Sequence, residues 1–166
     1  MIQLHPPISL LKIGMTCLLD DRCLRIRASS IDKPRGGIYL CKNVMKIQGW
    51  VLGLASSAVA IDLNLNGQNL RRKRLTIIRP DVYAAYPQAK EQDPCGFRLQ
   101  FPLKALPRAF RIDIIVLFED GNREAFAFIK GEHAPLGNET LHQSPAKLIR
   151  EAQKLEKLLR SLDPLV

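Results

Sequence analysis

The chain has 166 residues, of which 46% are hydrophobic and 25% charged, and it carries a net charge of +9 and 4 cysteines. This composition excludes intrinsic disorder, a disulfide-rich scaffold and a collagen-like repeat. No uncharged apolar run reaches about 18 residues, so we expect one folded domain with appendages and no transmembrane segment.

Residues 1–21 form an apolar segment that we predict to lie outside the folded module. The segment has no basic start and contains Pro6, Pro7 and Lys12, so it does not match an export signal. The spacing of the cysteines matches no zinc-binding or redox motif. They are Cys17, Cys23, Cys41 and Cys95. We therefore expect reduced thiols in a cytoplasmic protein, either free or at the periphery of the inner membrane.

Residues 22–130 contain a series of short runs in which apolar and polar residues alternate, as is typical of strands with one buried face. The runs cover residues 23–28, 44–52, 59–65, 69–78, 96–101, 110–118 and 124–129. Asn66-Gly67 and Asp120-Gly121 lie between consecutive runs and predict hairpin turns, because such turns need positive φ. Strands and helices do not alternate. We therefore predict an all-β fold, an antiparallel β-sandwich over residues 22–130.

Trp50, the single tryptophan, falls in the run over residues 44–52. The lone tryptophan of a β-sandwich is usually a core side chain that fills the space between the two sheets, and we predict this position for Trp50. The alternative is an exposed Trp50 whose ring stacks on a sugar, which would make the chain a carbohydrate-binding module.

The basic excess lies in the first half of the chain, where residues 1–80 hold 13 basic and 4 acidic side chains. It peaks at four consecutive cations, Arg71, Arg72, Lys73 and Arg74. With Arg25, Arg27 and Lys46, this cluster could bind nucleic acid or anionic lipid, or it could simply keep the protein soluble. A strand would turn the first and third of the four cations to one side and the other two to the opposite side, which halves the patch on each face.

The sequence Arg79-Pro80-Asp81 predicts a fixed corner at the end of the basic strand. Proline has no N–H to donate to a sheet, so Pro80 ends the strand. Asp81 can accept hydrogen bonds from backbone N–H groups of the following turn, and Arg79 can pair with a nearby carboxylate. We expect residues 82–94 to be a polar connection.

The last part of the chain is predicted to be a linker over residues 131–143 and an amphipathic helix over residues 144–163. Ser144 is a suitable N-cap and Pro145 suits the first helical position. Apolar residues then recur at steps of four and three: Leu148, Ala152, Leu155, Leu159 and Leu162. This stripe would dock on the sandwich, pair with a second copy of the chain, or contact another module.

The residues predict no catalytic site, no cofactor and no metal site. The three histidines, His5, His133 and His142, fall in segments predicted to be terminal or linking, where an ordered general base is not expected. The sequence has no glycine-rich phosphate loop and no Gly-x-Ser-x-Gly motif. We therefore expect that the chain is not an enzyme.

Four groups of residues occur in the same order as in a β-sandwich module of bacterial glycosyltransferases. They are Gly49-Trp50-Val51-Leu52, the hairpin at Asn66-Gly67, the run from Arg79-Pro80-Asp81 to Tyr86-Pro87, and Cys95-Gly96-Phe97. The chain thus resembles an immunoglobulin-like or fibronectin-III-like accessory domain found beside sugar-transferring and methyl-transferring domains of surface polysaccharide assembly. The likeness covers about two thirds of the chain. Cys95 stands where the module usually has serine, and the strand around Arg72 is unusually basic.

The resemblance implies a non-catalytic accessory or scaffolding module. Its expected partner is a glycosyltransferase or another polysaccharide-assembly enzyme, with the terminal helix as the point of attachment or of self-association. The alternatives are a carbohydrate-binding module that uses Trp50 and a polyanion binder that uses the basic strand. Nucleic acid is not the expected partner, because an aromatic content of 6% leaves little surface for base stacking.

Overall fold

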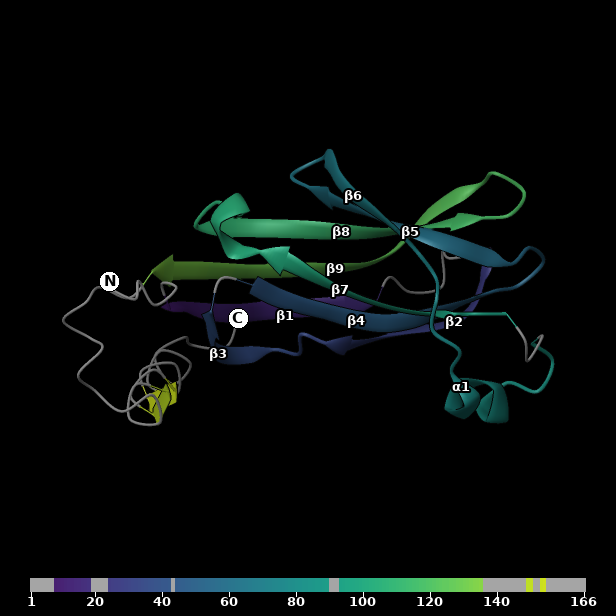
Figure 1. The fold of residues 1–166 in the computed structure, drawn as a ribbon, viewed down its shortest axis with the longest axis horizontal. Coiled ribbons are helices and arrows are strands. Elements are labelled where there is room, and N and C mark those ends of the chain that lie inside the picture. The colour runs from purple at the N-terminus through teal and green to yellow at the C-terminus, as the bar shows by residue number, and fades with distance from the viewer. Residues whose placement is uncertain are drawn as a thin grey trace, which may run out of the picture.

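The computed structural model describes residues 8–18, 24–42, 44–89, 93–135, 149–150 and 153–154. Within the described part of residues 8–135 the chain forms two antiparallel sheets and two short helical segments (Figure 1). The elements in chain order are β1 (Ile8–Leu18), β2 (Ile26–Lys33), β3 (Gly37–Lys42), β4 (Val44–Gly53), β5 (Ala58–Leu65), β6 (Gln68–Arg74), α1 (Pro80–Ala85), β7 (Gly96–Pro102), the 3-10 helix η1 (Leu103–Ala105), β8 (Ala109–Phe118) and β9 (Arg123–Pro135).

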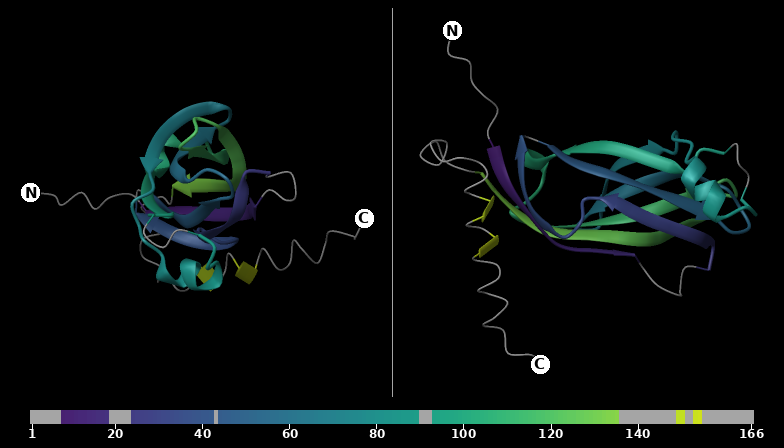
Figure 2. Two further views of the ribbon diagram at one scale, coloured as in Figure 1. Left: turned by 90° about the vertical axis from the view of Figure 1, so that its right-hand side faces the viewer. Right: turned by 90° about the horizontal axis from the view of Figure 1, so that it is seen from below.

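The larger sheet has the strand order β3-β1-β9-β8-β5-β6, and the smaller sheet has the order β2-β4-β7. Every pairing between neighbouring strands is antiparallel. Viewed along the long axis of the molecule, the strands of the two sheets surround one interior (Figure 2). The predicted all-β antiparallel architecture is therefore confirmed.

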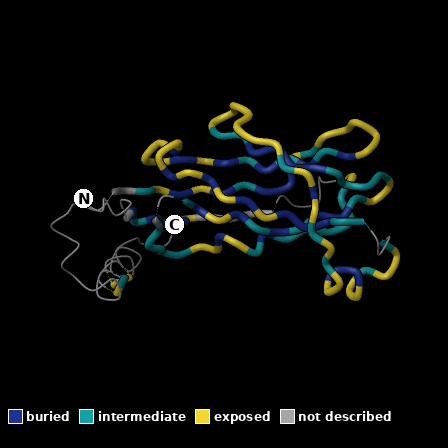
Figure 3. The backbone as a smooth tube through the Cα atoms, in the orientation of Figure 1, coloured by how far each residue is buried: buried dark blue, intermediate teal, exposed yellow. Residues whose placement is uncertain are grey.

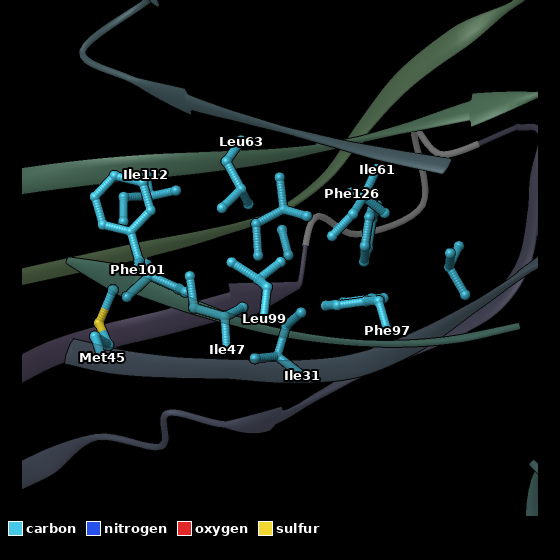
Figure 4. Packing of buried hydrophobic residues seen from close by; sticks show 14 of the residues in the cluster. Ile31, Met45, Ile47, Ile61, Leu63, Phe97, Leu99, Phe101, Ile112 and Phe126 are labelled. Carbon is cyan, nitrogen blue, oxygen red and sulfur yellow. The ribbon is translucent and has the colours of Figure 1, made fainter. Parts of the chain in front are cut away.

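The core lies between the two sheets and is built by the alternation seen in the sequence (Figures 3 and 4). In β7, Phe97, Leu99 and Phe101 are buried while Arg98 and Gln100 are exposed. The Phe97 ring from the smaller sheet meets the Phe126 ring of β9 edge to face, with centroids 6.4 Å apart. Period-two alternation therefore sets which face of each central strand points inward.

The hairpin between β5 and β6 follows the turn prediction. Asn66 has φ of 48° and Gly67 has φ of 87°, and the two residues join strands whose last pair is Leu65 with Gln68. Positive φ at both central positions matches the right-handed twist of the flanking strands. The turn between β8 and β9 has its positive φ at Gly121.

The boundaries of the module differ from those predicted. Residues 1–21 were expected to lie outside it, yet β1 pairs with both β3 and β9, and its Leu11 and Ile13 are buried. The predicted linker over residues 131–143 begins inside β9, which continues to Pro135. β1 and β9 pair with each other in the larger sheet. Their extent therefore depends on long-range pairing rather than on a clear local alternation of apolar and polar residues.

Two further elements were missed. Gly37–Lys42 forms β3, which lies in none of the predicted alternating runs. Pro80–Ala85 forms α1, which begins at the predicted corner and extends into the predicted polar connection, with Pro80 in its first turn. The basic strand also ends at Arg74, earlier than residue 78.

Of the C-terminal segment, the structure describes residues 149–150 and 153–154, both helical. The apolar stripe lies outside the described residues, so the terminal helix and its docking stay predictions: these positions are Leu148, Ala152, Leu155, Leu159 and Leu162. Among the helices that the structure describes, none is long and apolar enough to cross a membrane.

Candidate functional site

Two of the ordered motifs, those around Gly49-Trp50 and Gly96-Phe97, lie side by side on β4 and β7. In the ladder between these strands Gly49 is opposite Phe97 and Trp50 is opposite Gly96. Gly96 also forms an isolated bridge with Ile77, which brings the segment after β6 alongside the start of β7. Segments far apart in the sequence therefore build one corner of the smaller sheet.

Two glycines of this corner are required by close packing. A Cβ atom at Gly49 would lie 2.3 Å from the carbonyl oxygen of Ser30 on β2. A Cβ atom at Gly96 would lie 2.9 Å from Cβ of Ile77 and 3.1 Å from Cγ of Arg79. Both positions therefore have a structural reason for their lack of a side chain.

Arg79 ties this corner together with two carboxylates. Its Nε and Nη2 donate to the Asp81 carboxylate at 2.9 and 2.7 Å, and its Nη1 donates to Asp32 at 2.8 Å. The Arg79 guanidinium lowers the pKa of Asp81 to about 2, and a backbone hydrogen bond at Val82 contributes. The pair fixes the start of α1, and Asp32 links it to β2.

We expect Arg79→Met to raise the pKa of Asp81 from about 2 towards its ordinary value of 3.8. The methionine keeps an apolar stem against Gly96 but removes both guanidinium hydrogen bonds to Asp81. The pKa is measured by NMR titration of the Asp81 carboxyl carbon. An Asp81 pKa that stays at about 2 in the variant would mean that the backbone, rather than Arg79, holds the carboxylate.

Trp50 does not lie between the sheets, so that prediction is wrong. Ile47, Gly49 and Val51 face the core, which places Trp50 on the outer face of the smaller sheet. There it is half-buried beside Tyr86, with ring centroids 5.9 Å apart, next to the apolar cluster under α1. The same alternation along β4 could have indicated this outward position. Trp50 anchors α1, and part of its surface is already covered.

The apolar cluster under α1 contains a tyrosine and a cysteine that are not activated for chemistry. Burial raises the pKa of the Cys95 thiol, and it raises the pKa of Tyr83 to about 12. The Tyr83 hydroxyl donates to the backbone oxygen of Asp93. Both groups therefore remain protonated at neutral pH, which does not suit a nucleophile or a base.

The four consecutive cations of β6 are divided between two surroundings, as alternation predicts. Arg72 donates from Nε and Nη2 to Asp62 at 2.8 and 3.0 Å, and Arg123 donates to the same carboxylate at 2.7 Å. Arg71 points the other way and donates from Nη1 to the backbone oxygen of Gln100 at 2.9 Å. Arg72 is therefore committed to an ion pair, whereas Arg71 reaches the neighbouring sheet.

Asp62 is the buried acidic group that the sequence did not single out. It lies on the outward face of β5, yet its side chain is 0% exposed because Arg72 and Arg123 cover it. Hydrogen bonding to Arg72 and the nearby charges hold its pKa below the usual range, although burial opposes this. Arg123 comes from β9, so this three-residue cluster depends on long-range strand order.

A basic strip follows the line where the two sheets meet, which we call the β6–β7 seam and define by Lys46, Arg71 and Arg98. Arg71 contacts Gln100 of β7, and Lys46 is opposite Gln100 in the ladder. All three cations are exposed, and none has an acidic partner in the described part of the chain. The β6–β7 seam can therefore bind anions.

The other cations expected to join this cluster lie elsewhere. Arg25 pairs with Asp120 at 3.7 Å, and Arg27 lies on β2 near the far end of β4, beside Gly53 and Tyr83. Lys73 is half-buried and Arg74 is exposed, and neither has an ion pair within the described ranges. The structure thus joins Arg71 to Lys46 but not to Arg25 or Arg27.

His133, the one histidine among the described residues, contacts a backbone oxygen and an aromatic ring. His133 lies in β9, where its Nε2 is 2.7 Å from the carbonyl oxygen of Leu106 and its ring is near that of Phe110. His5 and His142 lie outside the described residues. A search of the described residues finds no group of three or more His, Cys, Asp or Glu side chains that could hold a metal ion.

Comparisons of the chain with protein-family models, with curated proteins and with solved structures find no match.

Proposed function

We propose that this chain is a non-catalytic accessory module of bacterial glycosyltransferase systems for surface polysaccharides. The observation that supports the proposal is that the motif residues take part in packing and ion pairs within the fold. One corner of the smaller sheet holds them: Gly49 and Gly96 allow close backbone packing, and Arg79 forms an ion pair with Asp81. Arg79 also bonds to Asp32. Such residues preserve a scaffold, and their order along the chain is the basis of the resemblance.

A scaffold of this kind acts through its surfaces, and two surfaces are available for a partner. One is the β6–β7 seam, where exposed cations would meet acidic side chains of a partner enzyme. The other is the predicted stripe of the terminal helix. Electrostatic complementarity at the seam would set the rate and specificity of association more than its affinity.

Affinity purification from native lysate, with mass spectrometry of the bound proteins, tests this proposal. We expect the full chain to recover a glycosyltransferase or another polysaccharide-assembly enzyme. Arg71→Glu combined with Arg98→Glu tests the seam, and Leu155→Glu combined with Leu159→Glu tests the stripe. Lys130→Glu is the control for a charge reversal elsewhere, since it changes an exposed charge on β9 of the larger sheet.

Two results would contradict the accessory role. One is transfer or hydrolysis of a nucleotide sugar by the purified chain, because an accessory module has no turnover of its own. The other is a set of bound proteins that contains no polysaccharide enzyme with the unaltered chain.

The unpaired cations of the seam favour a second candidate function, the binding of a polyanion. We expect the affinity for such a ligand to fall steeply with salt and to be lost when Arg71 and Arg98 are replaced by glutamate. Titration with dextran sulfate and with single-stranded DNA at two salt concentrations measures this. Equal affinities of the seam variant and the Lys130→Glu control would exclude the seam as the binding surface.

A further inference from the structure

A groove opens between the two sheets on the side of β3, and we call it the β3–β4 groove. Its volume is about 820 Å³. The floor consists of Leu11 and Met45, both core residues that are 1% exposed. Tyr39 and Cys41 form one wall and Val44 lies at the other side, at the start of β4. The groove is therefore mainly apolar where it meets the core.

The rim of the groove is positively charged. Lys33, Arg35 and Lys46 line it and are exposed, and none of them forms an ion pair with a residue that the structure describes. Asp32 also lines the groove, and its carboxylate accepts a hydrogen bond at 2.8 Å from Arg79, which also pairs with Asp81. An apolar floor under uncompensated cations matches a ligand with a long apolar tail and an anionic head.

We propose that the β3–β4 groove binds a fatty carboxylate, with its alkyl chain against the half-buried Tyr39, Cys41 and Val44 and its carboxylate between Lys33 and Arg35. The volume of the groove lies within the range of about 300 to 1,000 Å³ that is usual for small-molecule sites. Burial of the alkyl chain supplies the affinity, and the cations orient the head group.

The charge of the rim also argues against the terminal segment of this chain as the occupant. The residues from 144 onward carry 5 basic and 3 acidic side chains, so their net charge has the same sign as the rim. A fatty carboxylate supplies the opposite charge together with the apolar length. Strands β3 and β6 are opposite edges of the larger sheet, and the two cations assigned to the head group, Lys33 and Arg35, are not part of the β6–β7 seam. Lys46 belongs to both surfaces, but it is not one of the assigned head-group contacts, so this inference does not rest on the proposed function.

Cys41 provides a reporter for the occupied groove. Its thiol is free and half-buried in the groove wall, and burial raises its pKa. The full chain is treated with N-ethylmaleimide at mildly alkaline pH, with and without dodecanoate below its micelle concentration. Peptide mapping by mass spectrometry then gives the rate of modification at Cys41 separately from that at Cys95, which is buried under α1. We expect dodecanoate to slow modification of Cys41 and to leave Cys95 unchanged.

Calorimetric titration measures the affinity and how it depends on the length of the alkyl chain and on the charge of the rim. Each methylene added between decanoate and dodecanoate should tighten binding by up to about fourfold. Lys33→Glu combined with Arg35→Glu should weaken dodecanoate binding by at least about tenfold, because two attractive contacts become repulsive. Lys130→Glu, a single charge reversal at an exposed position of β9, should bind as the unaltered chain does.

Three outcomes would overturn the inference. The first is equal binding of dodecyltrimethylammonium, which has the same tail and the opposite charge. The second is binding that leaves the modification rate of Cys41 unchanged. The third is an equal loss of affinity in the Lys130→Glu control. Lys33 and Arg35 are exposed, so we expect their replacement to leave the fold intact. Circular dichroism spectra of the variants check this and separate a loss of binding from a loss of fold.

Discussion

We expect Gly49→Ala to unfold the protein or to lower its free energy of unfolding by about 3 kcal/mol or more. The new Cβ atom would lie 2.3 Å from the carbonyl oxygen of Ser30 and 2.9 Å from Cζ of Phe97. The Ser30 oxygen belongs to the backbone of β2, whose ladder pairs Ile31 with Gly49, so it cannot retreat without breaking strand pairing. Urea denaturation followed by circular dichroism measures the loss.

Gly121→Ala is the matched control for this variant. A Cβ atom at Gly121 would meet nothing within 4 Å, so only its φ of 86° opposes the change. That conformation costs about 1–2 kcal/mol for a residue with a side chain. Equal losses in the two alanine variants would contradict the clash at Gly49.

A double variant separates the two contacts of Gly49. Phe97→Leu shortens the side chain that lies 2.9 Å from the new Cβ atom but leaves the Ser30 oxygen in place. We expect no recovery of stability in Gly49→Ala with Phe97→Leu, because the backbone contact is the closer one. Substantial recovery would show that the aromatic ring is the limiting contact.

The sequence predicts the central strands well because their burial is local. Along β8 the buried residues recur at every second position, and along most of β4 and β7 they do the same. The turn at Asn66-Gly67 follows from its residue types. β1 was missed because its membership in the sheet depends on pairing with β9, more than a hundred residues later in the chain. The prediction for Trp50 is wrong because it rests on the usual place of a lone tryptophan in a sandwich. The alternation along β4 puts residue 50 on the outer face.

Some features of the candidate site follow from local sequence, and others depend on the order of the strands. The division of the basic strand between Arg71 and Arg72 follows from alternation alone. Asp62 appears in the sequence as a single acidic residue among apolar ones, and its role depends on Arg123, which only strand order brings near. The β3–β4 groove is likewise not readable from the chain, because it forms where the edges of two sheets approach each other.

We expect Asp62→Asn to lower the free energy of unfolding by about 3 kcal/mol at neutral pH. The carboxylate is 0% exposed and accepts hydrogen bonds from Arg72 and Arg123, and an amide would turn an N–H₂ group towards one of these donors. Asp113→Asn is the control, because Asp113 pairs only with Arg111 among the described residues and both side chains are partly exposed. That change should cost about 0.5 kcal/mol or less.

The difference between the unaltered chain and Asp62→Asn should disappear in acid. Arg72 and Arg123 hold the pKa of Asp62 in the folded protein below its value in the unfolded chain, which is about 3.9. A depressed pKa contributes stability that is complete above the unfolded value and is lost as the pH falls through the folded value. Urea denaturation of both proteins at neutral pH and at successively lower pH values, down to the most acidic pH at which both still fold, measures this convergence. A difference that stays constant over this range would show that the ionised carboxylate is not what stabilises the cluster, and that the amide of the variant destabilises the fold through packing alone.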